Sequence, residues 1–258
     1  MDLQIILDRF YKYVDGYRED GKLCKLLQEK LEHIERVAVN SVYIAKSEGW
    51  SDTDITKARL CGFYHDVGRF SQYKKYKTFS DSKSVNHGQH GFDVINENNM
   101  FDGLPENDAH NILDAVHYHN ALNIPDGLST ESVRFTKIVR DADKIDIFFQ
   151  LTDAIENKTL DNHKDLLWDL PIGEPNPVIV EKLLNNEGAL FSDIKSATDV
   201  CLMQLCWLYG MNYKSSITRL QKNRTIELMQ TIMPDTVIIR NCIEHIEEYV
   251  KIQQTTGD

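Results

Sequence analysis

Apolar residues recur three or four positions apart along most of this chain, with few prolines to interrupt them. The pattern is continuous between Leu3 and Tyr17 and again between Leu23 and Glu48. Such spacing places apolar side chains on one face of an α-helix. The chain has six prolines, and three of them fall within residues 171–177, so the other stretches can stay helical. The sequence therefore predicts an all-α fold.

Capping residues mark where several helices begin and end. Gly49 can close the helix that precedes it. Ser51, followed by an acidic residue at Asp54, resembles a capping box and predicts that a new helix begins there. Residues 64–85 are polar and contain glycine, which predicts a mobile loop. The predicted helices cover residues 3–17, 23–48, 52–63, 88–98, 105–118 and 131–156, followed by a second helical stretch over residues 178–254.

The length of 258 residues, at about 150 residues per domain, predicts either one large domain or one domain with an appendage. The proline-rich segment 171–177 separates the histidine-rich part of the chain from a stretch whose only histidine is His245. We therefore expect an N-terminal domain over residues 1–158. A C-terminal helical extension over residues 159–258 is expected to pack on it.

Charge and hydropathy argue against two classes of partner. Lys and Arg number 29 and Asp and Glu number 40, so the net charge of −11 disfavours broad binding to a nucleic acid backbone. The longest uncharged stretch, residues 200–213, is too short to span a membrane and predicts a buried helix. Trp168 and Trp207 are predicted to be core residues.

Two features indicate a cytoplasmic protein. Residues 1–4 lack the basic start of a secretory signal. The five cysteines are odd in number and include no CxxC pair, so we expect reduced core thiols rather than disulfides.

Histidines concentrate in one part of the sequence. Six of the nine lie between positions 65 and 119, and His33 precedes them on a predicted helix. A buried imidazole without a partner is costly, and a metal ion would supply one. Neutral imidazoles suit transition metals, and nearby carboxylates can supply the oxygen that bridges two metals. A helical bundle that lines a metal site contributes one ligand, or one pair of ligands, from each successive helix. The residues that follow this order are His33, His65 with Asp66, His87, His119 and Asp143.

These residues fall within short motifs, and over residues 30–150 the sequence resembles the HD-domain superfamily of metal-dependent phosphohydrolases. Among its members, the HD-GYP phosphodiesterases carry HD-[IV]-G-K, then H-P-x-x-G, then HHE and a late A-D. The corresponding strings in this chain are HDVGR at residues 65–69, HGQHG at 87–91, VHYHN at 116–120 and ADK at 142–144. The resemblance implies an HD-domain helical bundle with a C-terminal helical extension.

Three departures separate the chain from the HD-GYP group. Arg69 stands in place of lysine, His87 is not followed by proline, and residues 120–128 lack the GYP signature. Hydrolysis of cyclic dinucleotides is therefore not implied. The segment RDADKID at residues 140–146 is more similar to that of small stand-alone bacterial HD hydrolases.

The resemblance implies roles for individual residues. Asp66 would bridge two divalent ions, whose identity among Fe, Mn, Zn, Ni, Co and Mg stays open. A water activated between the metals would attack phosphorus, which makes Asp66 catalytic, and Arg69 could hold a substrate phosphate. The first metal would be held by His33, His65, Asp66 and Asp143, and the second by His87, His119 and Asp66.

The residues themselves leave alternatives open. His90 could exchange roles with His87, and His117 with His119. Asp141 and Asp146 compete with Asp143 for the last carboxylate position, because helical periodicity does not favour Asp143. A site with one metal is the alternative to a binuclear site.

The function that the resemblance implies is hydrolysis of a small phosphate ester or a nucleotide. The alternatives are a di-iron oxygenase and a catalytically silent regulatory module. The basic run at residues 74–77 is expected in a loop, either solvated or closing over an anionic substrate. Substrate, metal number and oligomeric state are left open by the sequence.

Overall fold

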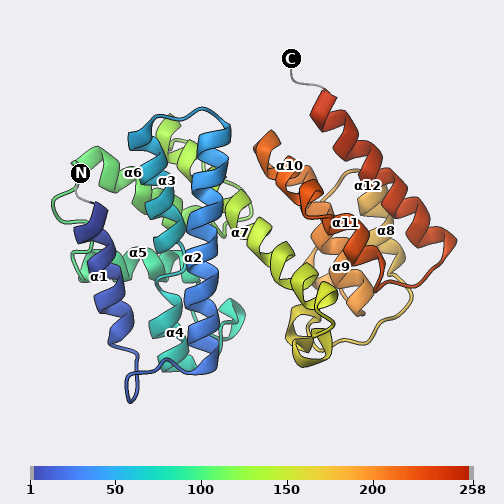
Figure 1. Cartoon of the computed structure of the whole chain (residues 1–258), viewed down its shortest axis with the longest axis horizontal. Coiled ribbons are helices and arrows are strands. Elements are labelled where there is room, and N and C mark those ends of the chain that lie inside the picture. Colours follow the sequence, from blue (N-terminus) through green and yellow to red (C-terminus); the bar gives the residue numbers. More distant parts are fainter. Residues whose placement is uncertain (1–2, 256–258) are drawn as a thin grey trace. The chain divides into compact units, whose positions relative to one another are not determined.

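Helices joined by turns make up the computed structural model, which describes residues 3–255 (Figure 1). Within that range no strand forms, and an isolated bridge joins Glu19 to Lys22, so the predicted all-α fold is confirmed. None of the described helices has the length and apolar character needed to cross a membrane. The prediction about a secretory signal concerns residues 1–4, of which residues 1 and 2 lie outside the described range. The helices are α1 Leu3–Asp15, α2 Lys25–Ser47, α3 Asp52–Tyr64, α4 Arg69–Tyr76, α5 His87–Glu97, α6 Glu106–Tyr118, α7 Thr130–Glu156, α8 Pro177–Leu184, α9 Ala197–Cys206, α10 Lys214–Lys222, α11 Thr225–Gln230 and α12 Val237–Thr255.

The chain divides into two compact units, residues 1–143 and residues 144–258. The division falls inside α7, so this helix contributes to both units. The expected domain boundary after residue 158 stays a prediction.

In the first unit, α2 and α3 run antiparallel and lie side by side (Figure 1). Gly49, with a φ of +68°, closes α2 and donates its backbone N–H to the carbonyl of Lys46 at 3.1 Å. Ser51 then caps α3, because its Oγ accepts the backbone N–H of Asp54 at 3.2 Å. Both predicted helix boundaries are confirmed.

Gly62 allows α2 and α3 to approach closely. A Cβ at this position would lie 2.5 Å from Cα and 2.8 Å from N of Ala38 on α2. Because both atoms belong to the backbone, no side-chain rotation can relieve the clash. Only glycine fits at this crossing, which sets the distance between the helices that carry His33 and His65.

We expect Gly62→Ala to lower the free energy of unfolding by about 1–3 kcal/mol, as overpacking in a filled core does. Urea denaturation of the variant and the wild type would measure the difference. Gly188→Ala is the control, since a Cβ there would meet no atom within 4 Å. Equal transition midpoints for wild type and Gly62→Ala would contradict the close approach.

The prediction that residues 64–85 form one loop is wrong in its middle part, where α4 lies. Phe70 is fully buried, and its ring packs edge-on against those of Phe10 and Tyr13, with centroids 6.4 and 6.5 Å apart. Two turns of helix, in which Phe70, Tyr73 and Tyr76 are the large aromatic residues, are too short to show a helical period. Lys74 and Lys75 of the basic run therefore lie in the last turn of α4 rather than in a loop.

In the second unit, α9 is buried along its whole length, as predicted for this stretch, but it ends at Cys206 and a 3₁₀ turn follows. The ring of Trp207 packs against Phe148, with centroids 5.9 Å apart. The prediction that Trp168 is a core residue is wrong. Trp168 follows a 3₁₀ turn, has a left-handed backbone conformation and is 43% exposed.

All five cysteines are free, and four of them are buried, as predicted for core thiols. Cys24 is exposed at the start of α2, contrary to that prediction.

Candidate metal centre

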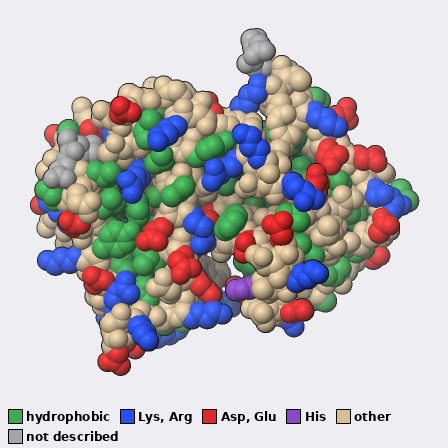
Figure 2. Space-filling view, viewed as in Figure 1, with side chains coloured by type: hydrophobic (Ala, Val, Ile, Leu, Met, Phe, Trp, Pro, Cys, Tyr) green, Lys and Arg blue, Asp and Glu red, His purple; other side chains and the backbone are tan. Residues whose placement is uncertain are grey.

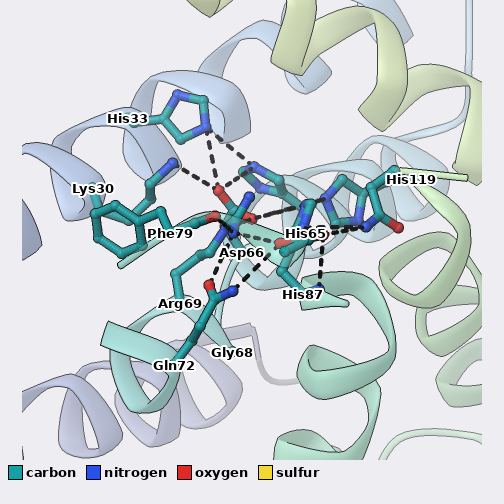
Figure 3. A network of polar contacts seen from close by, with 12 residues as sticks. Lys30, His33, His65, Asp66, Gly68, Arg69, Gln72, Phe79, His87 and His119 are labelled. Atoms are coloured by element: carbon teal, nitrogen blue, oxygen red, sulfur yellow. Dashed lines mark hydrogen bonds and ion pairs between the residues drawn. The ribbon is translucent and has the colours of Figure 1, made fainter. Parts of the chain in front are cut away.

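Five helices of the chain bring the six predicted ligands together. Figure 3 shows the side chains of five of these residues turned toward one another. His33 comes from the third turn of α2, His65 and Asp66 follow the last residue of α3, His87 begins α5, His119 follows α6, and Asp143 lies on α7.

The first group of potential ligands is built around His33 and His65. Their Nε2 atoms lie 3.3 Å apart. Asp143 places Oδ1 at 3.2 Å from Nε2 of His33 and at 3.9 Å from Nε2 of His65. Oδ2 of Asp66 lies 3.6 Å from the first histidine and 3.5 Å from the second. Two imidazole nitrogens and two carboxylate oxygens therefore converge on one point.

The second group uses the other oxygen of Asp66. Oδ1 of this carboxylate lies 3.7 Å from Nε2 of His87 and 3.8 Å from Nε2 of His119. The two histidine nitrogens are 3.0 Å apart. Asp66 thus faces one set of imidazoles with each of its oxygens, which is the arrangement of a bridging carboxylate.

Hydrogen bonds at the far side of two rings define which nitrogen faces the centre. Nδ1 of His65 donates to the carbonyl of Gly62, and Nδ1 of His119 donates to the carbonyl of Val116, both at 2.7 Å. A neutral imidazole that donates from Nδ1 keeps a lone pair on Nε2. The Nε2 lone pairs therefore point into the centre, where they are available to a metal.

Burial favours the neutral form of these imidazoles. Burial and the neighbouring His87 and His65 lower the pKa of His119 to about 3. Burial also lowers the pKa of His65, although Asp66 and Asp143 oppose the shift. His87 and His119 each hold an acceptor at Nδ1, so their Nε2 lone pairs face each other at 3.0 Å and repel unless a cation lies between them. The donor set consequently fits a divalent metal that accepts mixed nitrogen and oxygen ligands.

The carboxylates at the centre are held ionised. Burial raises the pKa of Asp66, but the charges of Lys30 and Arg69 outweigh burial, and the net pKa lies well below the ordinary range. Nζ of Lys30 is 3.0 Å from Oδ2 and Nε of Arg69 is 3.2 Å from Oδ1. Burial likewise opposes ionisation of Asp143, yet the hydrogen bond from His33 lowers its pKa overall. Both carboxylates are therefore ready to bind cations.

Arg69 links the centre to the segment that follows α4. Its Nη1 donates to the carbonyl of Phe79 at 2.7 Å, to Oδ1 of Asp81 at 3.0 Å and to Oε1 of Gln72 at 2.9 Å. With Nε on Asp66, the guanidinium acts as a brace between the central carboxylate and this segment. Its contact with a substrate phosphate stays a prediction.

The geometry separates the candidates that the sequence leaves open. Nε2 of His90 bonds to the hydroxyl of Ser71 at 2.7 Å, and His117 stacks on Tyr118 with centroids 4.1 Å apart. His87 and His119 are the members of these pairs that face Asp66. Among the described residues, the groups able to hold a metal include Asp143 and exclude Asp141 and Asp146, although both of these are buried.

Sequence reasoning missed Lys30 and Asp81. Lys30 precedes His33 by one helical turn, so its (i, i+3) position on the same face could have indicated that it approaches the site. Asp81 approaches His87 from a short 3₁₀ turn, Asp81–Lys83, and no periodic pattern marks such a residue.

Residues 31–157 match the model of the HD domain family. This range begins within α2, ends one residue after α7, and contains all six residues of the centre. No curated protein and no solved structure matches the chain significantly. The predicted resemblance is confirmed over this range: residues 31–157 of the chain are an HD domain.

Proposed function

We propose that this protein is a metal-dependent phosphohydrolase with a binuclear His/Asp centre that hydrolyses a small phosphate ester or a nucleotide. The position of Asp66 carries the proposal. Each of its oxygens lies 3.5–3.8 Å from two histidine nitrogens of a different group. A separation of this size leaves room for a metal ion between carboxylate and imidazole, on both sides of the carboxylate.

Bound divalent ions would supply an activated water and would neutralise the charge that develops on phosphoryl oxygens. The residues of the chain do the rest. The Nδ1 hydrogen bonds of His65 and His119 hold their rings so that Nε2 stays directed inward. Lys30 and Arg69 add positive charge on either side of Asp66, where an anionic substrate would approach.

The partner in this proposal is a small phosphorylated molecule rather than a nucleic acid backbone or a membrane. On the face drawn in Figure 2, Lys and Arg side chains lie interspersed among Asp and Glu side chains. Such a mixed surface does not favour a polyanionic backbone. The proposal includes the cytoplasm as the compartment, because all five cysteines are free thiols.

Elemental mass spectrometry on protein purified without chelator or metal resin tests the proposal. We expect close to two equivalents of Fe, Mn, Zn, Ni or Co per chain. The same sample should then release phosphate from some members of a panel of phosphomonoesters, phosphodiesters and nucleotides. About one equivalent would contradict the binuclear centre. Oxygen consumption by an iron-loaded sample would indicate an oxygenase instead, and binding without turnover a regulatory module.

A further inference from the structure

One of the histidines at the centre depends on a side chain for its orientation. His87 Nδ1 lies 2.6 Å from Oδ2 of Asp81, and its backbone N–H donates to the same oxygen at 3.3 Å. Asn120 Nδ2 donates to this oxygen as well, also at 3.3 Å. Because an ionised carboxylate can only accept, Nδ1 of His87 is the donor, and its Nε2 lone pair faces Asp66 and His119.

Asp81 is itself held at both oxygens. Oδ1 accepts from Nη1 of Arg69 at 3.0 Å and from Nε2 of Gln72 at 3.3 Å. Gln72 is fully buried on α4 and also donates to Oγ of Ser84 at 2.8 Å. Both carboxylate oxygens of Asp81 therefore accept hydrogen bonds from N–H groups, and two of the donors, Arg69 and Gln72, fix the carboxylate relative to α4.

His87 differs in this respect from His65 and His119. Those two rings donate from Nδ1 to backbone carbonyls of their own helices. Because these carbonyls belong to the helix next to the ring, the two hydrogen bonds do not depend on the position of a separate segment. A carboxylate partner, in contrast, comes from a separate segment and makes the imidazole a stronger donor to a metal.

We propose that Asp81 is a positioning residue that orients His87 and thereby sets the affinity of the second metal position, an inference that rests on the proposed binuclear centre. The geometry also joins the two halves of the centre. Arg69 contacts Oδ1 of Asp66, which faces His87, and it also contacts Asp81, which accepts the hydrogen bond from His87. One guanidinium therefore holds both carboxylates that face His87. Loss of Asp81 therefore weakens the second position and leaves the first in place, because His33, His65 and Asp143 contact one another and Oδ2 of Asp66.

The test is a titration of the chelator-stripped full chain with Mn²⁺, in which electron paramagnetic resonance measures the free ion. We expect the wild type to bind two equivalents. Asp81→Asn should bind the first with unchanged affinity and the second about 10–100-fold more weakly, which is the usual cost of losing an outer partner of a ligand. Asp93→Asn is the matched control, since Asp93 on α5 accepts a bond from Gln89 at an exposed site.

A second variant separates orientation of His87 from loosening of the segment. Gln72→Ala removes hydrogen bonds to Ser84, to the carbonyl of Val85 and to Oδ1 of Asp81, but it keeps the carboxylate and its Oδ2, which faces His87. It should lower the thermal unfolding midpoint while changing the second Mn²⁺ affinity less than Asp81→Asn does. An equal loss of affinity in both variants would overturn the positioning role.

The remaining outcomes distinguish the inference from the proposed function. If the wild type binds two equivalents and Asp81→Asn binds both with unchanged affinity, the role of Asp81 is overturned and the binuclear centre stands. If the wild type itself binds fewer than two equivalents, the binuclear centre is overturned, and the second position that Asp81 would support is lost with it.

Discussion

Asp66→Ala is expected to remove metal binding and hydrolysis together. The substitution deletes the carboxylate that faces both groups of histidines, so neither metal position keeps its oxygen bridge. Metal polarisation of a phosphoryl group is worth several kcal/mol, and about 1.4 kcal/mol changes a rate tenfold. We therefore expect kcat/KM to fall by at least about a thousandfold, with metal content close to zero by elemental analysis.

Two companion variants keep this expectation testable. Asp66→Asn conserves the volume of the side chain, so it guards against a general loss of folding in the alanine variant. Asp114→Asn is the matched control: Asp114 is also buried and accepts a hydrogen bond from Ser132 at 2.6 Å, but it belongs to neither group of ligands. Retained turnover in both Asp66 variants, with Asp114→Asn normal, would contradict a role for Asp66 in catalysis.

Helical periodicity predicted the helices of the first unit other than α4, and the motifs that carry the family resemblance indicated that six side chains converge. Each candidate ligand sits on or next to a helix whose apolar period is long enough to be recognised. His33 lies within α2, and the His65–Asp66 pair directly follows α3, whose cap at Ser51 is visible in the sequence. Periodicity sets the buried face of each helix, and polar residues next to that face can then only reach the interior of the bundle.

What the sequence did not predict depends on contacts between distant segments. Asp143 is an example: it lies on α7 with Asp141 but further from the centre of the apolar stripe, so the family resemblance favoured it and helical periodicity did not. Only the position of α2 decides between the two, by bringing Nε2 of His33 to 3.2 Å from Asp143. Asp81 is a second example, since its partners Arg69 and His87 are contributed by α4 and α5.

Lys30 and Arg69 explain how the centre is stabilised before a metal binds. Each contacts one oxygen of Asp66, at the positions that two metal ions would also approach. A buried carboxylate without such partners would lose several kcal/mol of solvation. The two cations therefore compensate the charge of Asp66. An incoming metal would compete with Lys30, whose Nζ pairs with Oδ2 of Asp66 and lies 5.6 Å from the centroid of the Phe79 ring.

Metal binding is expected to stabilise the folded chain strongly. The six ligands span residues 33–143 and come together only when the first unit folds, so the unfolded chain offers no comparable site. A ligand present at about 100 times its dissociation constant, bound to the native state alone, adds about 2.7 kcal/mol. For a unit of this size that corresponds to a rise of roughly 5–10 °C in Tm.

Thermal unfolding of the chelator-stripped protein, with and without added Mn²⁺ or Zn²⁺, measures this increment. Asp66→Ala should unfold at the same temperature with and without the metal, because its centre no longer holds the ion. Asp114→Asn should show the full increment even if its own starting Tm is lower, since the hydrogen bond from Ser132 contributes to the fold and not to the centre. An increment of equal size in wild type and Asp66→Ala would mean that the metal stabilises the chain at some other place, and it would remove the physical basis for a centre built around Asp66.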